Sequence, residues 1–150
     1  MQTVVRSLTV SLDTSAYANN DLLADTQELT DAVKANDSGG MIQSLTVVDQ
    51  DDNGQAFDVW ILDSNVTFGT ENSAPSISDA NAVYVLGKIP VAAADYIDLG
   101  GVKVASIRNV GLPIKPAAGG TSIYVAITNG TGTPTYTASG IKLRFGIVQG

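Results

Sequence analysis

Apolar and polar residues alternate along several short segments of the chain, most clearly near its C-terminal end. Between residues 141 and 147, every second side chain is apolar. The apolar row is Ile141, Leu143, Phe145 and Ile147, and the row between them is Lys142, Arg144 and Gly146. A period of two is typical of a β-strand with one face on a core and the other in water. We therefore predict a half-buried strand here.

The same alternation predicts further strands, separated by turns rich in Gly, Asn, Asp, Ser and Thr. They are expected over residues 3–12, 41–48, 55–62, 84–91, 102–110, 112–115 and 121–128. Arg6 interrupts the apolar row of the first strand, and Pro90 places 84–91 at a sheet edge. Both faces of 55–62 are apolar, which predicts cover on both sides. Its Trp60, the only tryptophan, is expected to pack in a core, with an interface anchor as the alternative.

Two helices and a hairpin are expected between these strands. Asp25 followed by Glu28 resembles a helix start, with Leu29, Ala32 and Val33 as a short apolar stripe that ends at Gly39-Gly40. Ser78 is expected to cap one helical turn that runs to about residue 84. The strands 41–48 and 55–62 flank a polar turn with Asn53-Gly54, which predicts that they pair as a hairpin.

About eight short strands, with two brief helices in their connections, favour an all-β fold. We expect a single β-sandwich domain over residues 1–150, jelly-roll-like, with an immunoglobulin-like sandwich as the second choice. The chain contains no run of about 18 apolar residues, so no membrane helix is predicted. Residues 1–13 lack the apolar run of a secretory signal.

The net charge of −7 is unevenly distributed along the chain. Residues 1–75 hold 12 acids and 2 bases, whereas residues 76–150 hold 3 acids and 6 bases, and no acid follows Asp98. This segregation is either a property of solvated strand faces or the mark of an acidic and a basic side. The second alternative suits head-to-tail assembly or a charged partner. Few bases and an acidic total argue against nucleic acid as the partner.

Side chains that usually perform catalysis are scarce. The chain has no histidine and no cysteine, which excludes thiolate metal sites, disulfides and thiol nucleophiles. Asp49-x-Asp51-x-Asn53-Gly54 matches the first half of a calcium loop, but the twelfth position is Trp60 rather than glutamate. A polar turn is favoured over a weak calcium site. We expect no enzyme, no cofactor and no metal centre; an enzyme would need a converging pair of carboxylates.

Four segments carry a resemblance to a known group of proteins. They are Leu8–Asp13 with Tyr17–Asp21, Val59–Asn65, Ser76–Asn81 and Gly140–Gly146. Together these segments resemble small virion proteins of tailed bacteriophages, in particular capsid decoration (cement) proteins. The resemblance spans nearly the whole chain and rests on structural motifs rather than catalytic ones.

The resemblance implies a β-sandwich bound to the outer surface of a capsid, as a homotrimer at local threefold positions. The major capsid protein would be its partner, with neither nucleic acid nor membrane involved. The interface candidates are Arg6, Trp60, Lys142 and Arg144, and a head-to-tail trimer would bring the acidic half against the basic half. The alternative is a fibre or baseplate module that binds a host surface or carbohydrate, with Tyr84, Tyr96, Tyr124 and Tyr136 as possible platform residues.

Overall fold

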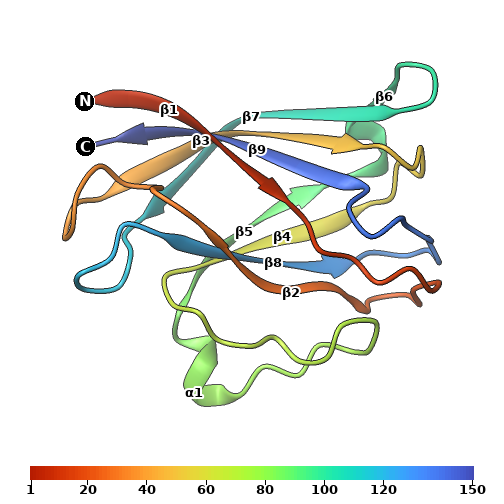
Figure 1. Ribbon diagram of the computed structural model, residues 1–150, viewed down its shortest axis with the longest axis horizontal. Helices are drawn as coiled ribbons and strands as arrows, with labels where there is room; N and C mark the ends of the chain where they lie inside the picture. The colour runs from red at the N-terminus through yellow and green to blue at the C-terminus, as the bar shows by residue number, and fades with distance from the viewer.

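A computed structural model describes residues 1–150 as two antiparallel β-sheets packed face to face (Figure 1). The five-stranded sheet has the order β1 (Gln2–Thr9), β9 (Ile141–Gln149), β3 (Gly40–Asp49), β7 (Lys103–Ile114) and β6 (Tyr96–Asp98). The four-stranded sheet has the order β2 (Leu22–Leu29), β8 (Ile123–Asn129), β4 (Phe57–Leu62) and β5 (Val85–Val91). The helices are one turn each, α1 (Asp79–Ala82) and η1 (Ala93–Asp95). Neither could cross a membrane.

The strand order is that of a jelly roll. The first half of the chain pairs antiparallel with the second half, β1 with β9, β2 with β8, β3 with β7 and β4 with β5. This double ribbon is rolled up so that β9 also pairs with β3, and β8 with β4. Successive strands alternate between the sheets, as in jelly rolls, except at β4–β5 and β6–β7, where both strands of the pair lie in the same sheet. The predicted β-sandwich and its first-choice topology are confirmed, and β6 adds a short edge strand beside β7.

The core lies between the sheets and holds 26 buried residues. The four apolar side chains predicted to face inward from β9 are all 0% exposed. Ile123, Val125 and Ile127 of β8 face them from the opposite sheet. The alternation in the sequence therefore identified the inner faces of these two strands correctly.

The helix predicted from Asp25 is wrong, because Leu22–Leu29 forms strand β2. Two register shifts in its pairing with β8 place Leu23 and Ala24 both in the core, which hides the period of two. Asp25 caps no helix. Its carboxylate accepts the Phe68 N–H and the Thr67 hydroxyl, each at 2.7 Å, and so tethers the distant 63–84 segment.

The hairpin prediction is wrong in its pairing, although both strands exist. β3 and β4 belong to different sheets, and residues 50–56 cross from one sheet to the other. The apolar rows of both strands face the same core from opposite sides, which pairing within one sheet would prevent. The positive φ angles fall at Asp52 (59°) and Gly54 (63°), and not at Asn53.

Strand β7 is continuous where two pieces were predicted. Asn109 (φ 59°) and Gly111 (φ 66°) form an irregularity within it, opposite a register shift between Ile42 and Ser44. Other local predictions are confirmed. Ser78 Oγ accepts the Asn81 N–H at the start of α1, and Pro90 lies in edge strand β5.

The outer face of the four-stranded sheet is covered by residues 63–84, drawn below the sheet in Figure 1. A second, smaller cluster is buried there, Leu22, Leu62, Phe68 and Ala126, with Trp60, Val66, Ile77, Val85 and Tyr124 packed against it. Strand 55–62 is thus covered on both faces, as its sequence predicted.

Two tyrosines in contact provide a matched test of buried hydrogen bonding. Tyr17 Oη donates to the Leu23 carbonyl and accepts the Asp13 N–H, both at 2.8 Å, whereas Tyr136 Oη is buried without a partner. Their rings lie 6.1 Å apart. We expect Tyr17→Phe to lower the free energy of unfolding by about 1–3 kcal/mol, because it leaves the Leu23 carbonyl and the Asp13 amide unpaired. Tyr136→Phe is expected to be neutral or stabilising. Urea denaturation measures both, and equal losses would contradict the assignment.

Candidate functional site

The outer face of the five-stranded sheet has no covering segment (Figure 1). Lys142 lies directly opposite Thr9 and Val48, and Arg144 lies opposite Ser7 and Thr46. Since residues opposite each other share a face, the register defines the outward positions among the paired residues. The set is Thr3, Val5, Ser7, Thr9, Met41, Ser44, Thr46, Val48, Ile97, Val104, Ser106, Arg108, Pro113, Lys142, Arg144, Gly146 and Val148. We call this surface the open face.

The charge of the open face is purely positive. Its ionisable residues are Arg108, Lys142 and Arg144, and no aspartate or glutamate occupies an outward position. Lys142 Nζ donates to the Ser139 carbonyl at 2.7 Å. The two ion pairs of the chain, Lys88–Asp58 and Lys103–Asp52, lie elsewhere. Both guanidinium groups of the open face are therefore available to a partner.

Exposed apolar side chains lie at both edges of the open face. Val5 on β1 is 54% exposed and Ile97 on β6 is 63% exposed. Between them the outward residues are mostly Ser, Thr and Val, and the Gly146 Cα lies so close to Ser44 Oγ that a Cβ there would clash. Short side chains lose little rotamer freedom when a partner covers them. The open face thus has exposed apolar side chains at its edges, mostly short side chains between them, and cations that form no ion pair.

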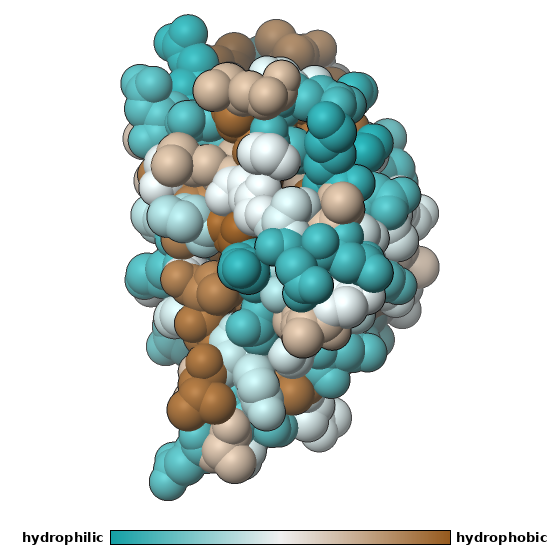
Figure 2. Space-filling model, turned by 90° about the vertical axis from the view of Figure 1, so that its left-hand side faces the viewer, coloured by the Kyte–Doolittle hydropathy of each residue, from teal (hydrophilic) through white to brown (hydrophobic).

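The end of the sandwich that carries both chain termini looks different. There hydrophilic and hydrophobic surfaces are interspersed, with the hydrophobic parts in a broken band along one side (Figure 2). This end offers no single apolar surface of the kind that marks a docking site.

The four interface candidates from the sequence lie in three places. Lys142 and Arg144 are on the open face. Arg6 is in the inward register opposite Phe145, and its Nε donates to the Asp31 carbonyl at 2.8 Å. Trp60 lies on the covered side of the other sheet. Arg108 was missed, although alternation through Val104 and Ser106 points it outward with them.

Trp60 lines a groove of about 570 Å³ beside the covering segment. Phe68, Pro75, Ile77 and Val85 form its apolar wall, and Asn20, Asp58, Thr128 and Asn129 its polar wall. Trp60 Nε1 donates to Thr128 Oγ1 at 2.9 Å. The centroid of its ring lies 5.8 Å from that of the Phe68 ring and 5.6 Å from Lys88 Nζ. Much of the indole is therefore engaged within the chain. Asn129 Oδ1 is buried without a partner, and Asn129 Nδ2 donates to the Ala18 and Gly132 carbonyls at 2.9 and 3.0 Å.

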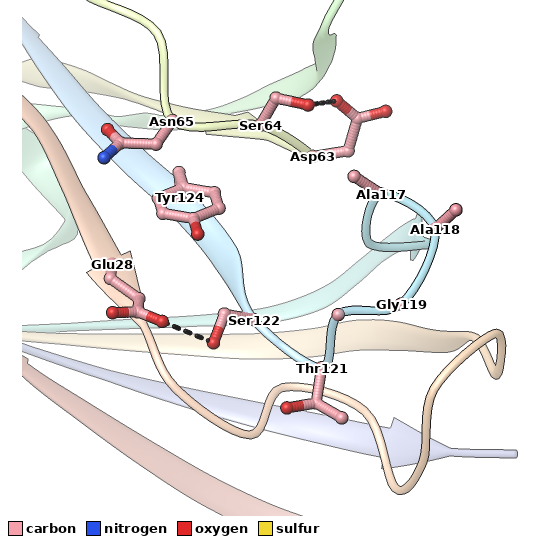
Figure 3. A pocket seen from close by; sticks show the side chains of 11 residues that line it. Glu28, Asp63, Ser64, Asn65, Ala117, Ala118, Gly119, Thr121, Ser122 and Tyr124 are labelled. Atoms are coloured by element: carbon pink, nitrogen blue, oxygen red, sulfur yellow. Dashed lines mark hydrogen bonds between the residues drawn. The ribbon is translucent and has the colours of Figure 1, made fainter.

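A second hollow, of about 350 Å³, lies between β2, the end of β4 and the β7–β8 connection (Figure 3). Ser122 Oγ donates to Glu28 at 2.8 Å and Ser64 Oγ donates to Asp63 at 2.9 Å. Figure 3 shows Tyr124 between Glu28 and Asn65. The serine hydroxyls are engaged as donors to carboxylates, and no basic side chain lines the hollow.

The turn that resembles half of a calcium loop uses its carboxylates internally. Asp49 accepts the N–H groups of Asp51 and Gly54, at 3.0 and 2.8 Å, one on each oxygen. Asp51 accepts the Thr137 N–H at 2.9 Å and its hydroxyl at 3.2 Å. No group of three or more Asp, Glu, His or Cys side chains is placed to hold a metal ion.

Glu71, in the covering segment, has a buried Oε1 without a partner. Burial, and next the charge of Asp13, raise its pKa above the ordinary value. A carboxyl whose pKa is higher in the folded than in the unfolded chain is held more favourably in its protonated form by the folded state. The free energy of unfolding therefore falls as pH rises through the folded pKa and the group ionises. We expect Glu71→Gln to be more stable than the original protein at pH 7. The difference should vanish near pH 4, where the acid is protonated. Urea denaturation at both pH values tests this, and a gain that persists at pH 4 would contradict it.

Comparison with known proteins assigns no family. The sequence matches no protein-family model and no curated protein. Among solved structures, the chain is similar to Desmodium yellow mottle tymovirus, at 10% identity and a TM-score of 0.33, over 97% of this chain and 85% of that one. It is also similar to the empty head of turnip yellow mosaic virus, at 8% identity and 0.30, over 97% and 79%. A third is the K3 adhesin domain of Lys-gingipain from Porphyromonas gingivalis, at 15% and 0.33, over 95% and 72%. Similarity at this level defines neither a family nor a function for the chain.

Proposed function

We propose that the chain is a virion structural protein, a capsid decoration protein that binds the outer surface of a tailed-phage capsid and stabilises the shell. The sequence resemblance supports this role, and so does the open face, the observation that carries the proposal. A broad sheet face with apolar edges, unpaired guanidinium groups and no acid suits docking onto another protein. No catalytic step and no cofactor form part of the proposed role.

Decoration stabilises a shell by mass action. A protein that binds the assembled shell, and not its dissociated subunits, shifts the equilibrium towards the assembled state. Stable association needs a contact of about 800 Å² on each partner. The chain exposes 7003 Å², so one broad face of the sandwich can supply a contact of that size.

The resemblance implies a trimer. Its contacts need a surface other than the positive open face and the acidic face on the opposite side of the sandwich. The open face is positive, whereas Glu28, Asp58, Asp63 and Asp79 belong to the opposite sheet or its covering segment. Contact between opposite faces would stack copies in an open line instead of closing a ring. Among the edge strands, β1 is the one that is long and regular, because β2 has bulges, β5 contains Pro90 and β6 has three residues. We therefore propose that the trimer forms around the β1 edge.

Co-sedimentation tests the proposed function. The purified protein is mixed with expanded shells, and separately with soluble capsid subunits, of the phage whose genome encodes it. We expect it to pellet with the shells at a fixed copy number, to leave the subunits unbound, and to raise the temperature at which the shells dissociate. A protein that stays in the supernatant at saturating shell concentration would contradict a decoration role.

The Trp60 groove favours a second candidate, a host- or carbohydrate-binding module. It combines aromatic side chains with polar ones, and lectin domains also use jelly rolls. Under this alternative the protein would bind particular glycans on an array, and Trp60→Ala would abolish the signal. Under the decoration role neither result is expected.

A further inference from the structure

We propose that the open face is the surface that docks onto the shell, and that it recognises an acidic protein surface through Arg108, Arg144 and Lys142. This inference rests on the proposed function and adds which face docks and the chemistry of the partner.

The position of the cations is the first argument. Arg108 lies opposite Ser44, Arg144 opposite Thr46, and Lys142 opposite Val48, so the three cations belong to three successive rows across β7, β3 and β9. Strands in a sheet lie about 4.8 Å apart and successive outward residues about 7 Å apart. The three charges therefore lie along one diagonal of the sheet, from Arg108 on β7 to Lys142 near the start of β9, flanked by hydroxyl and valine side chains.

The absence of counter-charges is the second argument. The chain carries 15 acidic residues, and none occupies an outward position of this sheet. In a protein with a net charge of −7, a carboxylate-rich partner would meet cations and no anion on this face. Such complementarity sets orientation and suppresses wrong partners.

The remaining surface decides between possible occupants. A nucleic acid would need a denser basic patch and would be repelled by the net charge. A second copy of the chain could bind the positive open face only through its acidic side. Repeating that contact from copy to copy would build an open stack. Val5 and Ile97, exposed at the two edges, favour a protein partner whose apolar residues cover them. An acidic surface of the assembled shell meets all these conditions.

Matched charge reversals test the proposal. R108E/R144E reverses two open-face charges, and K34E/K115E reverses two exposed charges elsewhere, so both variants reach the same net charge. All four side chains are exposed and make no ion pair, and thermal denaturation checks folding. We expect R108E/R144E to bind expanded shells more than about tenfold more weakly, with K34E/K115E close to the original protein. Binding of the original protein should weaken between 50 and 500 mM NaCl. The neutral pair R108Q/R144Q should bind with intermediate affinity.

The outcomes separate the two proposals. If the original protein fails to bind shells, the proposed function is wrong. If it binds and R108E/R144E binds equally well, the function stands and the docking face is wrong. A change in the native mass of R108E/R144E would make the open face a contact between copies, and binding of a DNA duplex by the original protein would make it a nucleic-acid surface. Either result would overturn the inference.

Discussion

Replacing Phe145 with alanine is expected to lower the free energy of unfolding by about 3–5 kcal/mol. Phe145 is 0% exposed in the middle of β9 and lies opposite Leu45 of β3 in the core register. Alanine removes most of the ring contacts and leaves a cavity, because neighbouring strands fixed by ladder hydrogen bonds can collapse only partly. For a chain of this length the midpoint of thermal unfolding should fall by roughly 10 °C.

Val148→Ala provides the control on the same strand. Val148 is three residues away in β9 but faces outward, opposite Thr3 and Met41. We expect a loss below about 1 kcal/mol. Urea denaturation should show a lower midpoint for Phe145→Ala with an unchanged slope. Similar losses for the two variants would mean that the assignment of inner and outer faces is wrong.

Asp49→Ala is expected to lower the free energy of unfolding by about 2–4 kcal/mol. The Asp49 carboxylate is 1% exposed and holds the N–H groups of Asp51 and Gly54. These two bonds shape the segment that carries the chain from one sheet to the other. Without them, two partly buried amides lose their acceptor.

Asp52→Asn is the matched change in the same turn. Asp52 is exposed, and its carboxylate has one ion pair, 3.8 Å from Lys103 Nζ. Asparagine keeps the positive φ of this position at little cost, so we expect a change within about 0.5 kcal/mol. Hydrogen exchange of residues 50–56 adds a local measurement. Faster exchange in Asp49→Ala alone is expected, and equal protection in both variants would rule out the role given to Asp49.

The inner faces of the regular strands could be predicted from the sequence, whereas the pairing of strands could not. β8 and β9 each have one face in the core, so burial leaves a visible period of two. In β2 two bulges bring consecutive residues into the core, and the Asp25 carboxylate that suggests a helix cap binds a segment more than forty residues away. Whether β3 pairs with β4 depends on contacts with β7, β9 and β8, which local sequence does not encode.

The candidate surface was predicted in part. Lys142 and Arg144 were identified because they alternate with core residues in the last strand. Arg108 joins them only through the register of β7 with β3, which follows from the rolled topology. Arg6 looked like an exposed interruption of an apolar row, but its side chain bonds the Asp31 carbonyl at the edge of the core.

A cryo-electron microscopy reconstruction of expanded shells, with and without bound protein, tests the central claim most directly. The account predicts added density on the outer surface at local threefold positions, into which the jelly roll fits with the open face towards the shell and Arg108 and Arg144 near shell carboxylates. Density at a tail or fibre instead, or a sandwich whose Trp60 side faces the shell, would contradict it.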